Sequence, residues 1–224
     1  MNQPITEDAG PKKLDMAKIG NFIARFGALF GLIILVLFLS FASPVFMTVD
    51  NISNIARQMV VNALLALGLL VAILTAGIDL SVGSILAVSM CSMAILAIKM
   101  HVNPYLSILI GLGIGLFFGW INGILLTKLH LPHPFISTLG TLNVARGIAL
   151  IITAASPISG FDRAGAPQVL FLGAGMLGPV PVSLFVLIIA YVVFHIMLTR
   201  TPFGRHIYAV GGNVNAARLS GINV

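Results

Sequence analysis

Six long apolar runs divide this chain of 224 residues, and they restrict it to folds that place helices in a membrane. A helix rises about 1.5 Å per residue, so about 20 apolar residues are needed to cross about 30 Å of hydrocarbon. The third run is the shortest, and the fifth contains Arg146. The expected spans are Phe26–Ser43, Gln58–Ala76, Ser84–Lys99, Tyr105–Thr127, Ile136–Ala155 and Val180–Leu198.

The composition also indicates a chain covered by lipid. Hydrophobic residues make up 58% of the sequence and charged residues 8%, with a mean hydropathy of +1.09, whereas a soluble domain carries roughly 25% charged residues. We therefore expect an all-α, polytopic transmembrane helical bundle in contact with membrane lipid. The net charge of +6 does not indicate nucleic-acid binding, because Lys and Arg collect in the cytoplasmic loops of membrane proteins.

Basic residues predict that the N-terminus lies in the cytoplasm. With this orientation the inner segments hold eight basic residues and the outer segments three, with Arg146 left out as embedded. Residues 1–22 are then a cytoplasmic tail, residues 23–199 the transmembrane domain and residues 200–224 a cytoplasmic loop. The first run is longer than the apolar part of a signal peptide, so we expect it to remain as a span. The basic residues are Lys12, Lys13, Lys18, Arg25, Lys128, Arg200, Arg205 and Arg218 inside, and Arg57, Lys99 and Arg163 outside.

The segment TAGIDLSVGS, Thr75 to Ser84, interrupts the apolar pattern with two glycines, an acid and two serines. Asp79 is the only acidic residue between Asp50 and Asp162. A carboxylate near hydrocarbon is costly and indicates a functional site by default. Irregular backbone at that depth is tolerated only where it is buried in protein or lines a cavity.

A structural role competes with a functional one for this segment. Asp79 and Ser81 can cap the third span, where a negative charge also suits the helix dipole. A place in the substrate path and a role in proton or ion coupling remain as alternatives. The residues of interest are Gly77, Asp79, Ser81 and Gly83.

Glycines recur every four residues in the fourth span, with Trp120 and Asn122 nearby. Small residues at this spacing let helices approach closely in lipid, so we expect one smooth packing face. Lining a path through the membrane is the alternative. The glycines of this face are Gly111, Gly115, Gly119 and Gly123.

The remaining polar residues inside the apolar runs predict no metal site. His130 and His133 form a close pair without a third ligand in register, and the single Cys91 excludes a cysteine cluster within one chain. Arg146 is expected to snorkel or to pair with a carboxylate. Thr138, Thr141 and Asn143 can return hydrogen bonds to the backbone, and His101, His195 and His206 carry no predicted chemistry.

The last segment, TPFGRHIYAVGGNVNAARLSGINV from Thr201, is basic, rich in glycine and only moderately apolar. A segment of this kind beside a membrane bundle suggests a cytoplasmic docking surface. Asn215 to Leu219 can form a short helix, with glycines on both sides that permit sharp turns. The sequence lacks the GxxxxGK[ST] pattern that cradles ATP phosphates, so any ATP must be hydrolysed by a partner.

Five motifs taken in order resemble one family. GIDLSVGS, PFISTLGT, ARG, ASPISGFD and FGRHIYAVGGNVNAARLSGINV are similar to permease subunits of bacterial ABC importers for monosaccharides, of the ribose/galactose/xylose branch. The resemblance runs from about Phe41 to the last residue, and it implies that the family domain continues beyond Val224. ASPISGFD looks most like galactose/methyl-galactoside permeases, whereas GIDLSVGS and AARLSGINV look equally like ribose permeases, so the sugar stays open.

The resemblance implies a homodimeric, multi-pass channel in the bacterial inner membrane, without catalysis or a cofactor of its own. A periplasmic sugar-binding protein would deliver the substrate and a cytoplasmic ABC ATPase would drive transport. The resemblance places the ATPase-coupling residues in the loop after the sixth span. They are Gly204, Arg205, Gly211, Gly212, Asn213, Ala216, Ala217, Arg218 and Gly221.

Three alternative functions compete with this one. A related ABC permease for branched-chain amino acids or another small solute would share the architecture. An ion-coupled secondary transporter would rest on Asp79 alone, and inverted repeats are not obvious. An intramembrane enzyme would need a nucleophile–base pair or a metal cluster, and the sequence shows neither.

Overall fold

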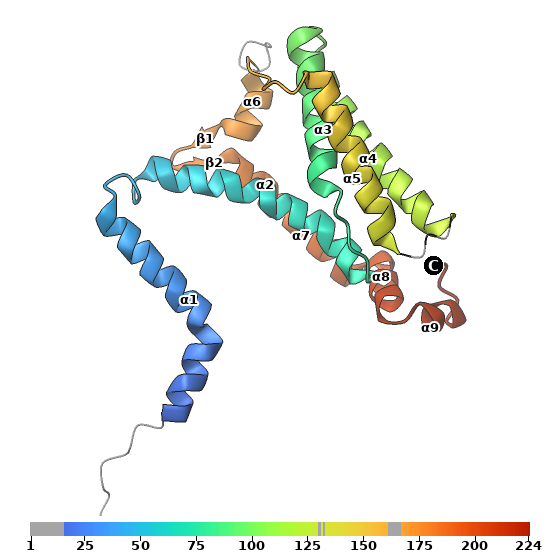
Figure 1. Cartoon of the computed structure of the whole chain (residues 1–224), viewed down its shortest axis with the longest axis horizontal. Helices are drawn as coiled ribbons and strands as arrows, with labels where there is room; N and C mark the ends of the chain where they lie inside the picture. The colour runs from blue at the N-terminus through green and yellow to red at the C-terminus, as the bar shows by residue number, and fades with distance from the viewer. Residues whose placement is uncertain (1–15, 130, 132, 161–166) are drawn as a thin grey trace, which may run out of the picture. The chain divides into compact units, whose positions relative to one another are not determined.

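The computed structural model describes residues 16–129, 131, 133–160 and 167–224. Within these residues it has six helices that are long and apolar enough to cross a membrane (Figure 1). The polytopic all-α fold expected from the sequence is therefore confirmed, and the cytoplasmic N-terminus remains a prediction. The long helices are α1 (Met16–Ala42), α2 (Val49–Leu74), α3 (Val82–Ala94) with the π-helical turn η1 (Ile95–Lys99), α4 (Pro104–Thr127), α5 (Pro134–Thr153) and α7 (Val182–Arg200).

Shorter elements flank α7 on both sides. The helix α6 (Pro167–Ala174) precedes a small hairpin, in which β1 (Met176–Leu177) pairs antiparallel with β2 (Val180–Pro181). Two further helices, α8 (Pro202–Gly212) and α9 (Val214–Leu219), follow α7.

Some span boundaries differ from the predicted ones. The predicted second span began at Gln58, but α2 already begins at Val49, so Arg57 lies within the helix rather than in an outer segment. The 26 residues of α2 extend about 39 Å at 1.5 Å per residue, which exceeds the hydrocarbon thickness and lets its first turns project.

Two other span ends were also predicted wrongly. The predicted fifth span ended at Ala155, but Ala154 and Ala155 both adopt positive φ and stop α5 at Thr153. The predicted sixth span began at Val180, which instead lies in β2.

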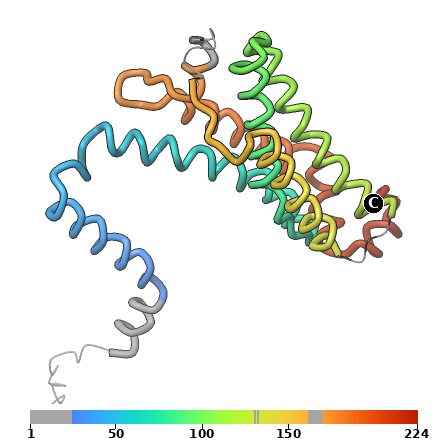
Figure 2. Tube along the Cα trace, turned by 45° about the horizontal axis from the view of Figure 1, so that its top comes forward, coloured from blue at the N-terminus to red at the C-terminus, as the bar shows by residue number. Residues whose placement is uncertain are grey.

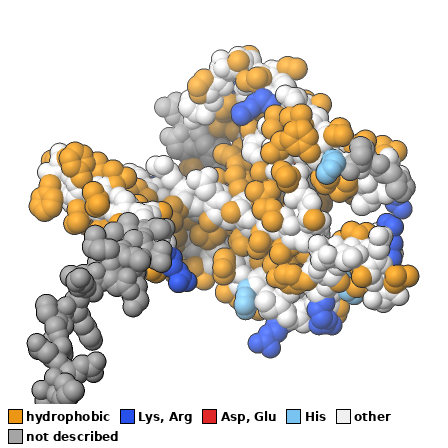
Figure 3. Space-filling model, turned by 60° about the horizontal axis from the view of Figure 1, so that its bottom comes forward, with side chains coloured by type: hydrophobic (Ala, Val, Ile, Leu, Met, Phe, Trp, Pro, Cys, Tyr) orange, Lys and Arg blue, Asp and Glu red, His pale blue; other side chains and the backbone are white. Residues whose placement is uncertain are grey.

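The chain forms two compact units, Met1–Ile52 and Ser53–Val224. In the first unit, none of the Arg25–Ala42 segment of α1 is buried, so this segment exposes apolar surface that suits lipid. In the second unit, α3, α4 and α5 run side by side (Figure 2). Apolar side chains also spread across the face shown in Figure 3, with Lys and Arg in a few separate places.

The bundle of α3, α4 and α5 has a small and tightly packed core. Val88 of α3, Phe118 of α4, and Ala145 and Ala149 of α5 form one buried cluster. The two alanines of α5 are buried in the same cluster as Val88 of α3, and small side chains between helices bring their backbones close in a membrane. This bundle positions the polar site described next.

Candidate functional site

The loop between α2 and α3 starts with a strained helix end. Ala76 has φ +59, and the N–H groups of Ala76 and Gly77 donate to the carbonyls of Ile73 (2.9 Å) and Ala72 (2.8 Å). This is a Schellman arrangement, in which the left-handed position is usually glycine. Gly77 follows it, and a Cβ there would lie 3.1 Å from the Ala72 oxygen. The loop therefore leaves α2 in a fixed direction.

Substituting Ala76 with glycine is expected to stabilise the protein. An L residue in the left-handed region costs roughly 1–2 kcal/mol that glycine avoids, so we expect a gain of about 1 kcal/mol. Thermal unfolding of the purified protein in detergent measures this gain. The matched change Ala56→Gly, inside α2, should destabilise the protein instead. If both variants changed the stability in the same direction, the strain assigned to the left-handed Ala76 would be contradicted.

Asp79 accepts two hydrogen bonds from Ser81 at the start of α3. The N–H of Ser81 donates to Asp79 Oδ1 at 2.8 Å and the Ser81 hydroxyl donates to the same oxygen at 2.5 Å. Ser81 is the N-cap residue, but its side chain makes no capping bond to the helix. The predicted capping by Ser81 is therefore wrong, because its hydroxyl is held by Asp79. Asp79 itself engages the backbone one position before the helix, where its charge still suits the dipole.

The hydrogen bonds continue from Ser81 into two other helices. Asn122 of α4 donates through Nδ2 to the Ser81 hydroxyl at 2.9 Å, and Thr141 of α5 donates to Asn122 Oδ1 at 2.5 Å. We call Asp79, Ser81, Asn122 and Thr141 the polar network. Ser81 is 0%, Asn122 8% and Thr141 6% exposed, so these three groups depend on one another for hydrogen bonds.

The network departs from one prediction and fits two others. Thr141 was expected to bond the backbone, but it bonds the Asn122 side chain because that amide faces it across the α4–α5 contact. The Thr138 hydroxyl does donate hydrogen bonds to backbone carbonyls, to Pro134 O at 3.0 Å and to Ile78 O at 3.3 Å. The side-chain amide of Asn143 also donates to a backbone carbonyl, that of Leu139, at 2.9 Å. Thr138 therefore ties α5 to the loop that carries Asp79.

The expected glycine face of α4 is present only in part. A Cβ on Gly111 would lie 3.1 Å from Met93 Cβ, and one on Gly115 would lie 3.4 Å from Ser89 Oγ, so both pack on α3. A Cβ on Gly119 or Gly123 would meet nothing within 4 Å. At about 100° per residue, a four-residue repeat drifts by about 40° at each step. The inward positions of α4 therefore pass from the glycines to Phe118 and Asn122.

The remaining residues of the Asp79 segment and the other lone polar groups show no assembled site. Gly83 has open space beside it, and Arg146 is exposed on α5. His133 is exposed, while His130 lies outside the described residues, as does the predicted outer residue Arg163. In the described part of the chain, no group of three or more His, Cys, Asp or Glu side chains is placed to hold a metal ion.

The two C-terminal helices are fixed by caps at their ends. The Thr201 hydroxyl accepts from Gly204 N–H at 3.2 Å, and Asn213 Oδ1 accepts from Ala216 N–H at 3.0 Å. At the end of α9, Gly221 has φ +80 and Ile222 N–H donates to Ala217 O at 3.0 Å. The short helix expected from Asn215 is thus confirmed, and it begins one residue earlier. The cap and the Schellman turn hold its six residues in a defined direction.

The glycines of this region serve contacts within the chain more than turns. Were a Cβ added, it would fall on the Leu198 carbonyl at Gly204 and on the Leu74 carbonyl at Gly211. Gly211 and Gly212 lie inside α8, and the chain turns at Asn213 with φ −162 and ψ 110, which any residue can adopt. The expectation that glycines before α9 provide the turn is therefore wrong. Gly211 instead lets α8 touch the end of α2.

The predicted coupling residues divide into inward and outward groups. Gly204 is buried and Ala217 is 3% exposed, so both face the chain itself. Leu219 is 90% exposed. We give the name α8–α9 surface to the predicted coupling residues that are exposed on or beside these two helices, together with Leu219. They are Arg205, Gly212, Asn213, Ala216, Arg218 and Leu219, with the exposed Gly221 just beyond them.

Sequence reasoning missed Asn122 as a member of the network and Tyr191, His195 and Tyr208 as the lining of a pocket between α2, α7 and α8. Asn122 carried one usable signal. It follows Ser107, Gly111 and Phe118 at helical spacing, and all four lie on the buried face of α4. The pocket had no signal, because its residues come from three separate helices.

Known proteins resemble this chain over most of its length. A family model described as branched-chain amino acid transport system / permease component matches residues 51–224. The ribose import permease protein of Bacillus subtilis is 42% identical over 209 residues, which cover 93% of this chain and 62% of that protein. No solved structure matches.

Two Escherichia coli proteins add other sugars to the comparison. The D-allose transport system permease protein is 44% identical over 206 residues, 91% of this chain and 61% of that protein. The galactose/methyl galactoside import permease protein is 35% identical over 210 residues, which cover 86% of this chain and 61% of that protein. The chain spans less than two thirds of the length of these relatives. Because the family model covers well over half of the chain, this multi-pass membrane protein belongs to the permease component family of the branched-chain amino acid transport system type.

Proposed function

We propose that this chain is the permease subunit of an importer that moves a monosaccharide across the bacterial inner membrane. A separate ABC ATPase would supply the energy, a periplasmic binding protein would deliver the sugar, and a second permease copy would complete the path. The relatives named for ribose, allose and galactose import support a sugar over other solutes. The chain itself performs no chemistry on the sugar.

The observation that carries the proposal is the α8–α9 surface. A helix of six residues is not stable alone in water, yet α9 is held by the Asn213 cap, the turn at Gly221 and the buried Ala217. The fixed helix exposes Leu219 and the cation of Arg218. An ordered, exposed pair of this kind beside the last span suits a protein partner with an apolar, acidic cleft.

A movement of α8 would reach the polar network through direct contacts. Gly211 touches the carbonyl of Leu74, the last residue of α2. Five residues later, Asp79 holds Ser81 at the start of α3, and Ser81 is tied to α4 and α5. Docking of an ATPase on the α8–α9 surface would therefore bias the position of the three-helix bundle. In this account Asp79 is a structural anchor rather than an ion-coupling carboxylate.

Changing Arg218 to Glu tests the docking role. We expect the variant to insert in the membrane normally. The amount of ATPase that it retains in detergent should fall at least about tenfold, since a glutamate facing an acidic cleft places like charges together at the interface, which costs several kcal/mol. Co-purification with the ATPase measures this loss. Lys99→Glu makes the same charge change in η1, outside the surface, and should retain the ATPase. Undiminished retention by the Arg218 variant would contradict the proposed docking surface.

A second candidate is import of branched-chain amino acids, which the description of the family model names. Uptake of labelled leucine and valine beside labelled ribose, allose and galactose separates the two. We expect uptake of a sugar and none of the amino acids. ATP-dependent uptake of leucine with no sugar uptake would replace our proposal with this candidate.

A further inference from the structure

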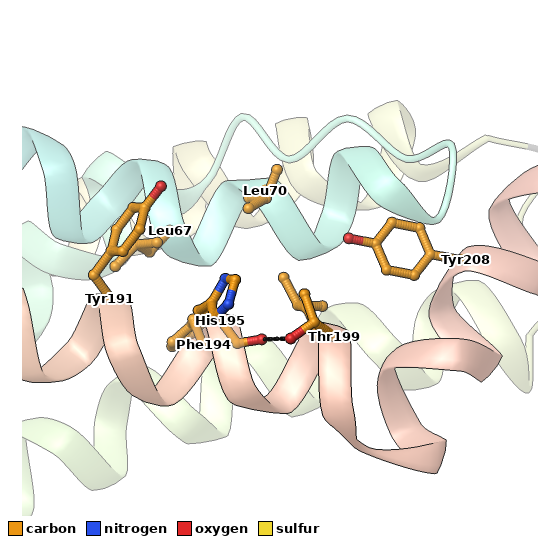
Figure 4. Close-up of a pocket in the computed structure, with 8 residues that line it drawn as sticks. Leu67, Leu70, Tyr191, Phe194, His195, Thr199 and Tyr208 are labelled. Carbon is orange, nitrogen blue, oxygen red and sulfur yellow. Dashed lines mark hydrogen bonds between the residues drawn. The ribbon is translucent and has the colours of Figure 1, made fainter.

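A pocket of about 180 Å³ lies between α2, α7 and α8 (Figure 4). Leu67 and Leu70 of α2 form its apolar side, and Tyr191 and His195 of α7 and Tyr208 of α8 bring polar groups to it. Figure 4 shows the two tyrosines at opposite ends with His195 between them, and the Tyr208 hydroxyl directed into the pocket. The space is smaller than the roughly 300–1,000 Å³ of sites for drug-sized ligands, so it suits a single ring.

The two polar residues that α7 brings to the pocket, Tyr191 and His195, lie within the length of a membrane span. His195 is five residues and Tyr191 nine residues before the end of α7 at Arg200, which places them about 7.5 Å and about 13.5 Å from that end. Within the described part of the chain, the only side-chain hydrogen bond between lining residues joins the Thr199 hydroxyl to the main-chain oxygen of His195, at 2.7 Å. The imidazole and both tyrosine hydroxyls therefore remain available to a ligand, and leaving the two groups of α7 without a polar partner in hydrocarbon would be costly.

The lining also indicates the chemical class of that ligand. No Asp, Glu, Lys or Arg is among the described residues that line the pocket, so a zwitterion or a phosphate would find no full counter-charge. Tyrosine rings offer apolar faces to C–H groups, while their hydroxyls and an imidazole both donate and accept hydrogen bonds. A small neutral polyol ring matches this combination.

We propose that the pocket between α2, α7 and α8 is a binding site for a neutral monosaccharide. The inference rests on the proposed transport of a sugar and adds where the sugar is held. Tyr208 lies on α8 between two glycines that pack closely on backbone. Gly204 packs against the Leu198 carbonyl, and Gly211 packs against the Leu74 carbonyl. Movement of α8 therefore changes the distance of Tyr208 from the α7 residues, which ties sugar release to the docked ATPase.

Protection of an engineered cysteine tests the site. Thr199 lines the pocket and its hydroxyl bonds only to the main chain of its own helix. In a Cys91→Ser background, ribose, allose or galactose should slow maleimide labelling of Thr199→Cys by at least about threefold. Thr127→Cys, exposed at the end of α4, is the matched control, and no sugar should protect it. Labelling is measured on the intact permease in vesicles.

Removing single hydroxyl groups gives a second measurement. Tyr191→Phe and Tyr208→Phe should each lower the maximal uptake rate about 3- to 10-fold, the range for one lost hydrogen bond, without lowering the unfolding temperature. Tyr105→Phe removes a hydroxyl outside the pocket and should transport normally.

Three results would overturn the inference. If the wild type takes up a sugar but no sugar protects Thr199→Cys, the pocket proposal alone fails. Protection by added phospholipid, and by no sugar, would identify a lipid site instead. If the wild type takes up none of the sugars, the proposed function fails, and the pocket proposal fails with it.

Discussion

Gly211→Ala is expected to lower transport strongly, because among the described glycines Gly211 leaves the least space for a Cβ. The added Cβ would fall on the carbonyl oxygen of Leu74, a backbone atom that cannot rotate away. Overpacking of a tight contact costs about 1–3 kcal/mol, and more where backbone must move. We expect α8 to separate from α2, with a fall in ATP-dependent uptake of at least tenfold and a lower unfolding temperature.

The neighbouring glycine provides a matched control. A Cβ at Gly212 would meet nothing within 4 Å, and alanine is favoured over glycine in a helix by about 1 kcal/mol. Gly212→Ala should therefore leave stability unchanged or slightly raised. Thermal unfolding of the two purified variants measures the difference, and equal unfolding temperatures would show that α8 does not depend on its approach to Leu74.

Asn122→Leu is expected to destabilise the bundle of α3, α4 and α5 by about 2–4 kcal/mol. The change leaves the Thr141 hydroxyl without its acceptor and the Ser81 hydroxyl without its donor, and both residues are buried. Each buried polar group left unsatisfied costs about 1–3 kcal/mol. The measurement is the unfolding temperature in detergent together with the amount of folded protein in the membrane.

Two further variants separate the network from side-chain volume. Asn143→Leu makes the same change on α5, where the side chain is exposed and bonds only its own helix, so its effect should stay within about 0.5 kcal/mol. Adding Thr141→Val to Asn122→Leu removes the orphaned hydroxyl and should recover about 1 kcal/mol. If Asn122→Leu were no worse than Asn143→Leu, the polar network would not hold the three helices together.

Hydropathy was sufficient to predict the six spans, because lipid imposes a minimum length on any apolar helix. Hydropathy did not predict the ends of the helices, because polar residues can also be helical. The first turns of α2 contain Asp50, Asn51 and Asn54, yet they are helical because Thr48, Asp50 and their neighbours favour a helix start. The hairpin before α7 was missed because its two-residue strands are too short to show an alternating pattern.

In the candidate sites, contacts between residues close in the sequence were predictable, whereas contacts between separate helices were not. Asp79 and Ser81 are two residues apart, so their proximity was evident, whereas their link to Asn122 and Thr141 depends on how α4 and α5 rotate against α3. The caps of α9 were readable from Asn213 and Gly221. The tight contact of Gly211 with Leu74 was not, because it joins helices separated by most of the chain.

ATP-dependent uptake is the most direct test of the central proposal. The permease, expressed as its gene encodes it, is reconstituted in vesicles with its cognate ATPase and sugar-binding protein, and labelled ribose, allose, galactose and leucine are compared. We expect uptake of at least one sugar, which requires ATP and is unaffected when a protonophore collapses the proton gradient. Uptake that survives without ATP and stops with the protonophore, or uptake of leucine alone, would contradict the account.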